Sequence, residues 1–113
     1  MKNLCFATII LVATAVFTSA QTTDSKAILR RGDALVAQEN YKLAIEEYRK
    51  VSTRDRDGFA RATYNIGVCY YELWQTDDAI EFYKRAIDLR RGNYPVASYA
   101  LGIALEDQDK TTE

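Results

Sequence analysis

The sequence predicts an all-α protein, a stack of antiparallel helix hairpins with about five helices. Two observations carry this prediction. After the first 20 residues, apolar side chains recur with the helical period through most of the chain. Small and aromatic residues also repeat at a fixed spacing of 35 residues: Gly32, Gly67 and Gly102 (67 − 32 and 102 − 67), Ala44 and Ala79, and Tyr48 and Tyr83. Such a period is typical of stacked helical hairpins.

Punctuating residues divide the chain into the expected elements. We expect helices over about residues 23–38, 41–53, 57–73, 76–90 and 94–107, separated by Asn40 and by polar or glycine-containing segments at 54–58 and 91–93. Pro95 suits the first turn of the last helix, where a missing N–H is harmless. No linker or low-complexity tract divides the chain, so we expect one domain.

The segment 64–89, YNIGVCYYELWQTDDAIEFYKRAIDL, resembles a tetratricopeptide repeat. Gly67 and Ala79 match the family's pair of small residues, Tyr70 and Tyr83 its large aromatics, and Ala86 its late small residue. The resemblance implies a right-handed superhelical stack of two and a half repeats, at about 25–59, 60–94 and 95–113. One departure concerns the turn between the two helices of a repeat, where Glu39 and Trp74 replace the family's glycine.

Residues 1–20 predict a cleaved export signal. Lys2 supplies the positive end, residues 4–17 are almost wholly apolar, and Thr18, Ser19 and Ala20 offer small residues before a cleavage point. An uncleaved membrane anchor is the alternative, but the apolar core is short for a bilayer span of about 20 residues. We therefore expect an exported protein, periplasmic or extracellular, with a domain at 21–113 and no stable membrane insertion after cleavage.

The residue types argue against catalysis. The chain has no histidine, and no phosphate-binding glycine loop, nucleophile elbow or metal-ligand spacing, so we expect neither an enzyme nor a metal or other cofactor. Cys69 lies 35 residues from Ala34 and from Ala104, which predicts a small buried packing position; an intermolecular disulfide is the alternative.

Charge gives no sign of a nucleic-acid partner. The whole chain has 15 basic and 16 acidic residues, and no basic stripe is interleaved with aromatic residues. The pairs Arg30–Arg31 and Arg90–Arg91 fall near expected helix ends, where a surface role is the simplest interpretation.

The family resemblance implies where a partner binds, because the first helix of each repeat lines a concave groove in that family. The 35-residue register then gives an apolar, aromatic groove for a protein or peptide. Some of its tyrosines have an alternative role in packing the repeats together. The groove residues are Leu29, Asp33, Val36, Tyr64, Val68, Tyr71, Tyr99 and Ile103.

The two ends of the stack differ. Arg31 occupies the position of Ile66 and Leu101, so the first repeat looks capped, whereas residues 95–105, PVASYALGIAL, contain no charge. Repeat stacks ordinarily end in a helix with a polar outer face. An uncovered last helix predicts a homodimer, a different protein partner, or a small patch that a monomer tolerates. The expected self-association face is Val96, Tyr99, Ala100, Ile103 and Ala104.

Two functional classes remain open on the sequence. The first is a non-catalytic adaptor or scaffold that binds another protein through the groove, the uncapped last helix, or both. The second is an accessory carbohydrate-binding protein in which Tyr64, Tyr71, Tyr99 and Trp74 stack on sugar rings. Carbohydrate platforms also need polar groups beside the aromatics, and this groove offers mainly Asn65, Glu72 and Ser98.

Overall fold

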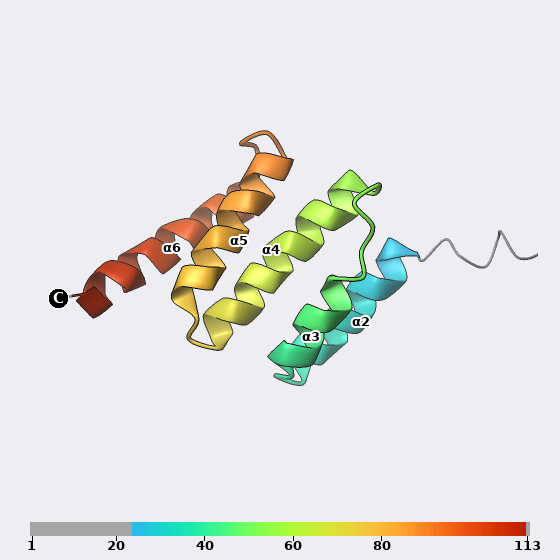
Figure 1. Ribbon diagram of the computed structural model, residues 1–113, viewed down its shortest axis with the longest axis horizontal. Helices are drawn as coiled ribbons and strands as arrows, with labels where there is room; N and C mark the ends of the chain where they lie inside the picture. The colour runs from blue at the N-terminus through green and yellow to red at the C-terminus, as the bar shows by residue number, and fades with distance from the viewer. Residues whose placement is uncertain (1–23, 113) are drawn as a thin grey trace, which may run out of the picture.

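The computed structural model describes residues 24–112, which form five α-helices and no strands (Figure 1). Each helix packs against the next one in the chain, and α2 also contacts α4. The helices line up as successive antiparallel hairpins, with α2 at one end and α6 at the other (Figure 1). The predicted all-α fold class is confirmed. The helices are α2 (Ser25–Ala37), α3 (Tyr41–Tyr48), α4 (Arg56–Glu72), α5 (Thr76–Leu89) and α6 (Pro95–Thr112).

Aspartates begin the first helix of each complete hairpin. The Asp24 carboxylate accepts a 3.0 Å hydrogen bond from the Lys26 amide, and Asp55 accepts one of 3.0 Å from the Gly58 amide. These bonds satisfy N–H groups that have no partner within the helix. The hydrogen bond from Gly58 also lowers the pKa of Asp55.

Three non-glycine residues end helices in the left-handed conformation. Glu39, Trp74 and Arg91 have φ angles of 58°, 62° and 55°. In each case the next residue's amide donates back to a carbonyl five residues earlier, for example Gln75 to Tyr70 at 2.9 Å. This pattern closes the last turn of a helix and usually uses glycine. The turns that lack the family's glycine therefore keep the glycine-type backbone with bulkier residues.

Each complete hairpin is held by a glycine on its first helix and a tyrosine on its second. A β-carbon on Gly32 would lie 2.3 Å from Tyr48 Cε1, and one on Gly67 would lie 2.8 Å from Tyr83 Cδ1. Both tyrosines are buried. The same glycine–tyrosine contact is therefore made in both hairpins. In each, the absence of a side chain on the glycine gives room for the tyrosine ring.

The core runs along the stack in adjoining clusters. The cluster of α2, α3 and α4 includes Ile28, Ile45, Tyr48 and Cys69, and the cluster of α5 and α6 includes Ile80, Tyr83 and Ala104. Cys69 and Ala104 are fully buried, as predicted. The same expectation for Ala34 is wrong, because it is exposed. Within residues 24–112 no hairpin precedes α2, so nothing covers that position.

The N-terminal end carries charge where the later repeats carry apolar side chains. Ile66 and Leu101, which occupy the position of Arg31 in their repeats, pack into the clusters described above. Arg31 instead is exposed and donates a 2.6 Å hydrogen bond from Nε to Glu47 Oε1 on α3. Hydrogen bonds from Lys50 and Arg31 lower the pKa of Glu47. The polar first helix suits an end that contacts water.

Two helix ends differ from the prediction. Helix α3 stops at Tyr48 and not near residue 53, and a turn follows in which Val51 N donates to Tyr48 O at 3.2 Å. Helix α6 continues to Thr112 and not only to about residue 107. Its polar last turns are held by side-chain contacts, including a 2.5 Å hydrogen bond from Gln108 Nε2 to Asp77 Oδ1.

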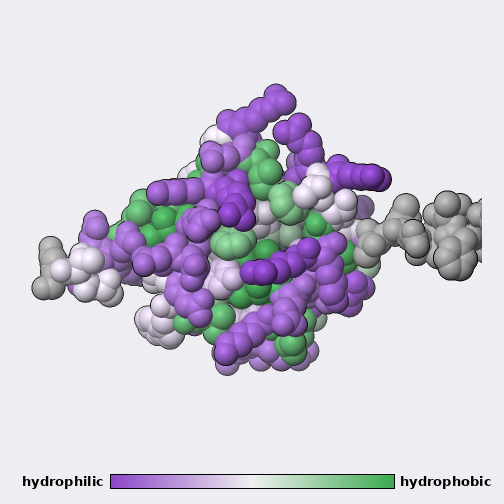
Figure 2. All heavy atoms as spheres, in the orientation of Figure 1, coloured by the Kyte–Doolittle hydropathy of each residue, from purple (hydrophilic) through white to green (hydrophobic). Residues whose placement is uncertain are grey.

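The surface seen in the orientation of Figure 1 is mainly hydrophilic, and hydrophobic residues show as patches between the polar ones (Figure 2). None of the helices in residues 24–112 is long and apolar enough to cross a membrane.

Candidate functional site

An apolar hollow of about 230 Å³ lies between α4 and α6. Three side chains of α4 and four of α6 face each other across it, and the ring of Tyr83 from α5 contributes a buried wall. Hydroxyl groups of tyrosines are the only polar side-chain groups on its lining. The lining residues are Tyr64, Val68, Tyr71, Tyr83, Val96, Tyr99, Ala100 and Ile103.

Aromatic packing fixes the wall of the hollow at Tyr64. Its ring centroid lies 5.8 Å from that of Tyr83 and 5.6 Å from that of Tyr94, in tilted arrangements that favour aromatic attraction. Burial raises the pKa of the Tyr64, Tyr83 and Tyr94 hydroxyls. Tyr64 is therefore held by the packing between the repeats, which is the alternative role expected for some of the tyrosines.

A hydrogen bond joins α4 to α6 at Tyr71, whose hydroxyl donates to Asp107 Oδ2. This bond is the main reason that the pKa of Tyr71 is raised. Helix α4 is thus joined through Tyr64 to Tyr94, the residue before α6, and through Tyr71 to Asp107 in α6. The hollow is lined by Tyr64, Tyr71 and residues of both helices that lie between these contacts in sequence.

Tyr99, Val96 and Ile103 are the exposed residues of the hollow. Tyr99 is 74% exposed, Val96 is 48% exposed and Ile103 is 37% exposed. Large apolar side chains with this much exposed area are available to a partner, and their burial is worth about 25 cal/mol per Å² before the costs of association.

Five of the eight predicted groove residues line this hollow: Tyr64, Val68, Tyr71, Tyr99 and Ile103. Asp33 and Val36 lie instead in a neighbouring hollow of about 200 Å³ with Tyr48, Asn65 and Val68. Leu29 lines neither hollow, because it is buried in the core cluster of α2, α3 and α4. Its inclusion in the groove needs correction: the side chain faces inward and offers no surface to a partner.

The carboxylate of Asp33 is already engaged within the fold. It accepts hydrogen bonds from the Tyr48 hydroxyl at 2.6 Å, from Arg61 at 2.9 Å and from Asn65 at 3.3 Å. Burial, followed by the bond to Asp33, raises the pKa of Tyr48. Asp33 therefore ties α2 to α3 and α4, and the neighbouring hollow has an engaged carboxylate at its wall.

The predicted self-association face does not form one outward surface. Val96, Tyr99, Ala100 and Ile103 line the hollow toward α4, while Ala104 is fully buried against the α5 cluster and is unavailable to a second copy. The register places Gly102 at the position of Gly32 and Gly67, which face the second helix of their own hairpins. A β-carbon on Gly102 would meet nothing within 4 Å.

Trp74 extends the exposed aromatic surface beyond the hollow. It is 92% exposed, it has the left-handed backbone described above, and it lines a further hollow of about 250 Å³ with Tyr71, Asp107 and Lys110. Tyr71 lines both hollows, and Val68 lines both the central hollow and the one beside Asp33. The three hollows are thus adjoining, and together they form the groove surface.

No metal-binding cluster accompanies the groove in the part of the chain that the structure describes. No group of three or more Cys, Asp or Glu side chains is placed to hold a metal ion there. Cys69 is buried, and burial raises the pKa of its thiol to about 11, which disfavours the reactive thiolate.

The helix hairpins, the glycine–tyrosine contacts and the groove define a helical repeat protein of the kind that presents a surface to other proteins. The tetratricopeptide repeat family model matches residues 29–95, more than half of the chain, and the chain belongs to that family. A search of the curated proteins finds no match to the sequence. Tetratricopeptide repeats are in general non-catalytic modules that bind proteins, and the family assignment indicates this class of function.

Proposed function

We propose that this chain is an exported, non-catalytic adaptor that binds a protein or peptide in the groove between α4 and α6. The observation that carries the proposal is the exposure of Tyr99 and Ile103 beside a preformed apolar hollow. Pockets that bind ligands are typically apolar, largely preformed and few in number. The export part rests on the signal-like residues 1–20, which lie outside the described residues.

The shape of the groove favours an extended or helical peptide that inserts apolar side chains. The central hollow, at about 230 Å³, has room for one large side chain, and it adjoins a hollow on each side. One partner residue occupies the space between Tyr64 and Tyr99, and residues further along the partner pass Tyr71 toward Trp74.

The carbohydrate alternative has weaker support. Sugars require hydrogen-bonding groups beside aromatic rings, and the Tyr71 hydroxyl and the Asn65 amide already have partners within the fold. Within residues 24–112, Tyr99 and Trp74 are the aromatic rings with the largest exposure, and they lie in different hollows.

Selection from a peptide library tests the proposal and does not require an identified partner. A random peptide library is first enriched for peptides that bind the wild-type chain. Peptides that also bind a variant with both Tyr99→Ala and Ile103→Ala are then removed. We expect the remaining peptides to share large apolar residues and to lose at least about tenfold in affinity on Tyr99→Ala, the scale of an interface residue that contributes more than about 1.4 kcal/mol.

Leu43→Ala is the matched control, because Leu43 is an exposed apolar residue on α3 that lines none of the three hollows. Equal binding to the wild type and to the Tyr99→Ala variant would contradict the groove. A glycan array run on the same variants tests the alternative, which requires a glycan signal that disappears with Tyr99. Export is tested separately by the intact mass of the protein recovered outside the cytoplasm, which must lack residues 1–20.

A further inference from the structure

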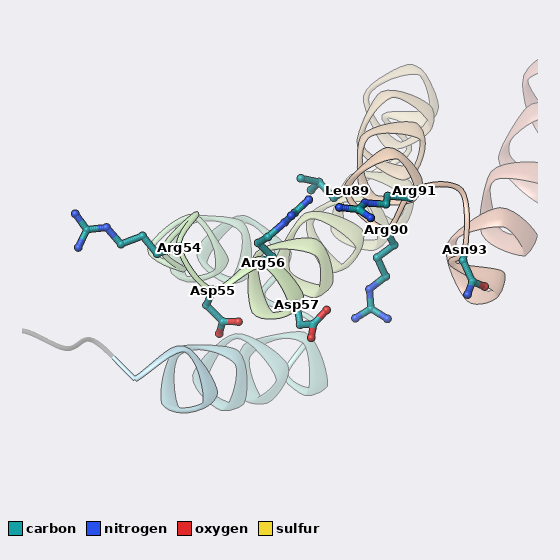
Figure 3. A pocket seen from close by; sticks show the side chains of 8 residues that line it. All are labelled: Arg54, Asp55, Arg56, Asp57, Leu89, Arg90, Arg91 and Asn93. Atoms are coloured by element: carbon teal, nitrogen blue, oxygen red, sulfur yellow. The ribbon is translucent and has the colours of Figure 1, made fainter.

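Four arginines line one cleft at the edge of the stack, away from the groove. The cleft has a volume of about 570 Å³ and lies between the loop that precedes α4 and the loop that follows α5 (Figure 3). Its lining residues are Arg54, Arg56, Arg90, Arg91, Asp55, Asp57, Leu89 and Asn93.

The repeat itself brings like charges together here. Arg56 and Arg91 are 35 residues apart (91 − 56), so they occupy the same position in successive repeats, and stacking places their loops side by side. Figure 3 shows the side chains of Arg56 and Arg91 pointing toward each other, whereas Arg54 points away from the other arginines and Arg90 points toward the side of Asp57. Two guanidinium groups that share a cleft repel each other unless an anion compensates them.

The arginines have no anionic partner within residues 24–112. Ion pairs there involve Arg31, Lys50, Arg61, Arg85 and Lys110, and none involves an arginine of this cleft. The Nε atom of Arg90 is buried and has no hydrogen-bond partner, which holds for no other buried side-chain nitrogen or oxygen in the described part of the chain. Buried polar groups are normally satisfied. Such an orphaned donor indicates a missing acceptor.

The nearby carboxylates only partly compensate the positive charge of the arginines. Asp55 is occupied as the cap of α4, where it accepts the Gly58 amide. Asp57 lies in the first turn of α4, a favourable place for an anion in its own right. Four arginines and two aspartates line the cleft, which gives a local excess of two positive charges.

Helix stabilisation explains only part of the cluster. Arg90 and Arg91 follow the last turn of α5, where the helix dipole favours a cation. Arg56 is the first residue of α4, the end at which the dipole disfavours a cation. Arg90 is also fixed in place, because its guanidinium lies 4.1 Å from the centroid of the Tyr94 ring.

We propose that this cleft binds a tetrahedral oxyanion, a phosphate or sulfate group. The guanidinium fork of arginine matches the oxygens of such a group with two parallel hydrogen bonds. Arg56 approaches from the start of α4 and Arg91 from the loop after α5. Arg90 lies on the same lining, and the Tyr94 ring holds its guanidinium in place. The site is independent of the groove, because none of its lining residues lines the hollow between α4 and α6.

NMR titration of the full chain with inorganic phosphate, and separately with inorganic sulfate, tests the site at constant ionic strength maintained with chloride. The arginine Nε–Hε signals are followed directly. We expect saturable shifts of the Arg90 and Arg91 signals with at least one of the two anions. Arg56→Gln and Arg91→Gln should each weaken binding about tenfold or more, the scale of one charge-assisted hydrogen bond. Both residues are exposed, so neither change threatens the fold.

Arg85→Gln is the matched control, because Arg85 also lies over an aromatic ring, that of Phe82 at 4.9 Å, but is paired with Glu81. It should leave the affinity unchanged. Arg91→Lys keeps the charge and removes the fork, so it should weaken binding less than Arg91→Gln. Shifts that fail to saturate with either anion, or that are the same in the wild type and the Arg56→Gln and Arg91→Gln variants, would overturn the proposal.

Discussion

The ring of Tyr48 occupies the space that a side chain on Gly32 would need, with Cε1 only 2.3 Å from the position of a β-carbon. Tyr83 and Gly67 repeat this relationship at 2.8 Å, and Gly102 has no such neighbour within 4 Å. The three glycines have the same position in the repeat and different surroundings.

Alanine at these glycines should therefore have opposite effects. We expect Gly32→Ala and Gly67→Ala to lower the free energy of unfolding by about 1–3 kcal/mol, because each forces a buried ring to move. Gly102→Ala should raise it by about 0.5–1 kcal/mol, because alanine favours a helix interior and meets no neighbour. Urea denaturation followed by circular dichroism measures all three. A loss at Gly102 similar to that at Gly67 would show that another element covers this face.

A substitution at Trp74 should affect stability and binding in opposite directions. Trp74→Gly should raise the free energy of unfolding by on the order of 1 kcal/mol, because glycine adopts a φ of 62° without strain. The same change removes a 92% exposed aromatic ring from the groove surface, so peptides that reach this end should bind more weakly. The measurement pairs thermal unfolding with the affinity of a selected peptide. Glu39→Gly, at the equivalent turn with a φ of 58°, is the control that should stabilise and leave binding unchanged.

Cys69 should make the fold sensitive to alkali. Because burial raises the pKa of its thiol to about 11, the folded chain keeps a proton that the unfolded chain loses above about pH 8.5. The stability contribution is fully present below that pH and is lost as the pH rises toward 11, with a slope of at most about 1.4 kcal/mol per pH unit.

Cys69→Ala removes this component, and alanine already occupies the equivalent buried position at Ala104. The free energy of unfolding, measured with reductant from neutral pH to pH 11, should fall less steeply in the variant than in the wild type. Tyrosine ionisation contributes to both proteins and cancels in the comparison. Parallel curves would contradict the assignment.

Self-association remains a prediction, and the structure makes Leu105 the most informative position at which to test it. Leu105 is 38% exposed, lies one helical turn from Gly102 and lines none of the groove hollows. A dimer formed through the face that lacks a second helix should dissociate on Leu105→Glu. Reductant should have no effect, because Cys69 is buried.

Light scattering over a wide concentration range, with and without reductant, measures the mass directly. A dimer that Ile103→Glu disrupts and Leu105→Glu does not would place the contact at the groove. A monomer at every concentration would contradict self-association altogether.

The 35-residue period predicted the hairpins because it reports which positions must be small or aromatic in every repeat. Helix ends were harder to predict. Val51 is buried although α3 ends at Tyr48, so the apolar pattern continued past the end of the helix. At the C-terminal end of α6 the helix instead continues past the apolar pattern, because residues 106–112 show no apolar period and yet are helical. Contacts such as Gln108 with Asp77 hold that segment, and they join residues far apart in sequence.

For the candidate site, too, one part could be predicted from the sequence and another part could not. The family resemblance and the register together predicted five of the α4 and α6 residues of the hollow, because the register aligns the first helices of successive repeats. Val96 and Ala100, which also line it, were expected on the self-association face instead. The wall at Tyr83 comes from a second helix, and only packing reveals it. Leu29 was misplaced because the register of the groove was extended to a repeat whose first helix turns that residue into the core. The spacing of Arg56 and Arg91 was a signal for the arginine cleft, but it becomes informative only when the loops are stacked.

The one-sided support of α6 affects how the groove works. Within the described residues α6 packs mainly against α5, so its local unfolding should require less free energy than that of α4, which is covered by helices on both sides. Yet α6 supplies half of the groove's central hollow. A partner that binds there also orders this helix, and its affinity includes the cost of doing so. Amide hydrogen exchange in α6 therefore becomes a direct reporter of occupancy, slowing when the groove is filled.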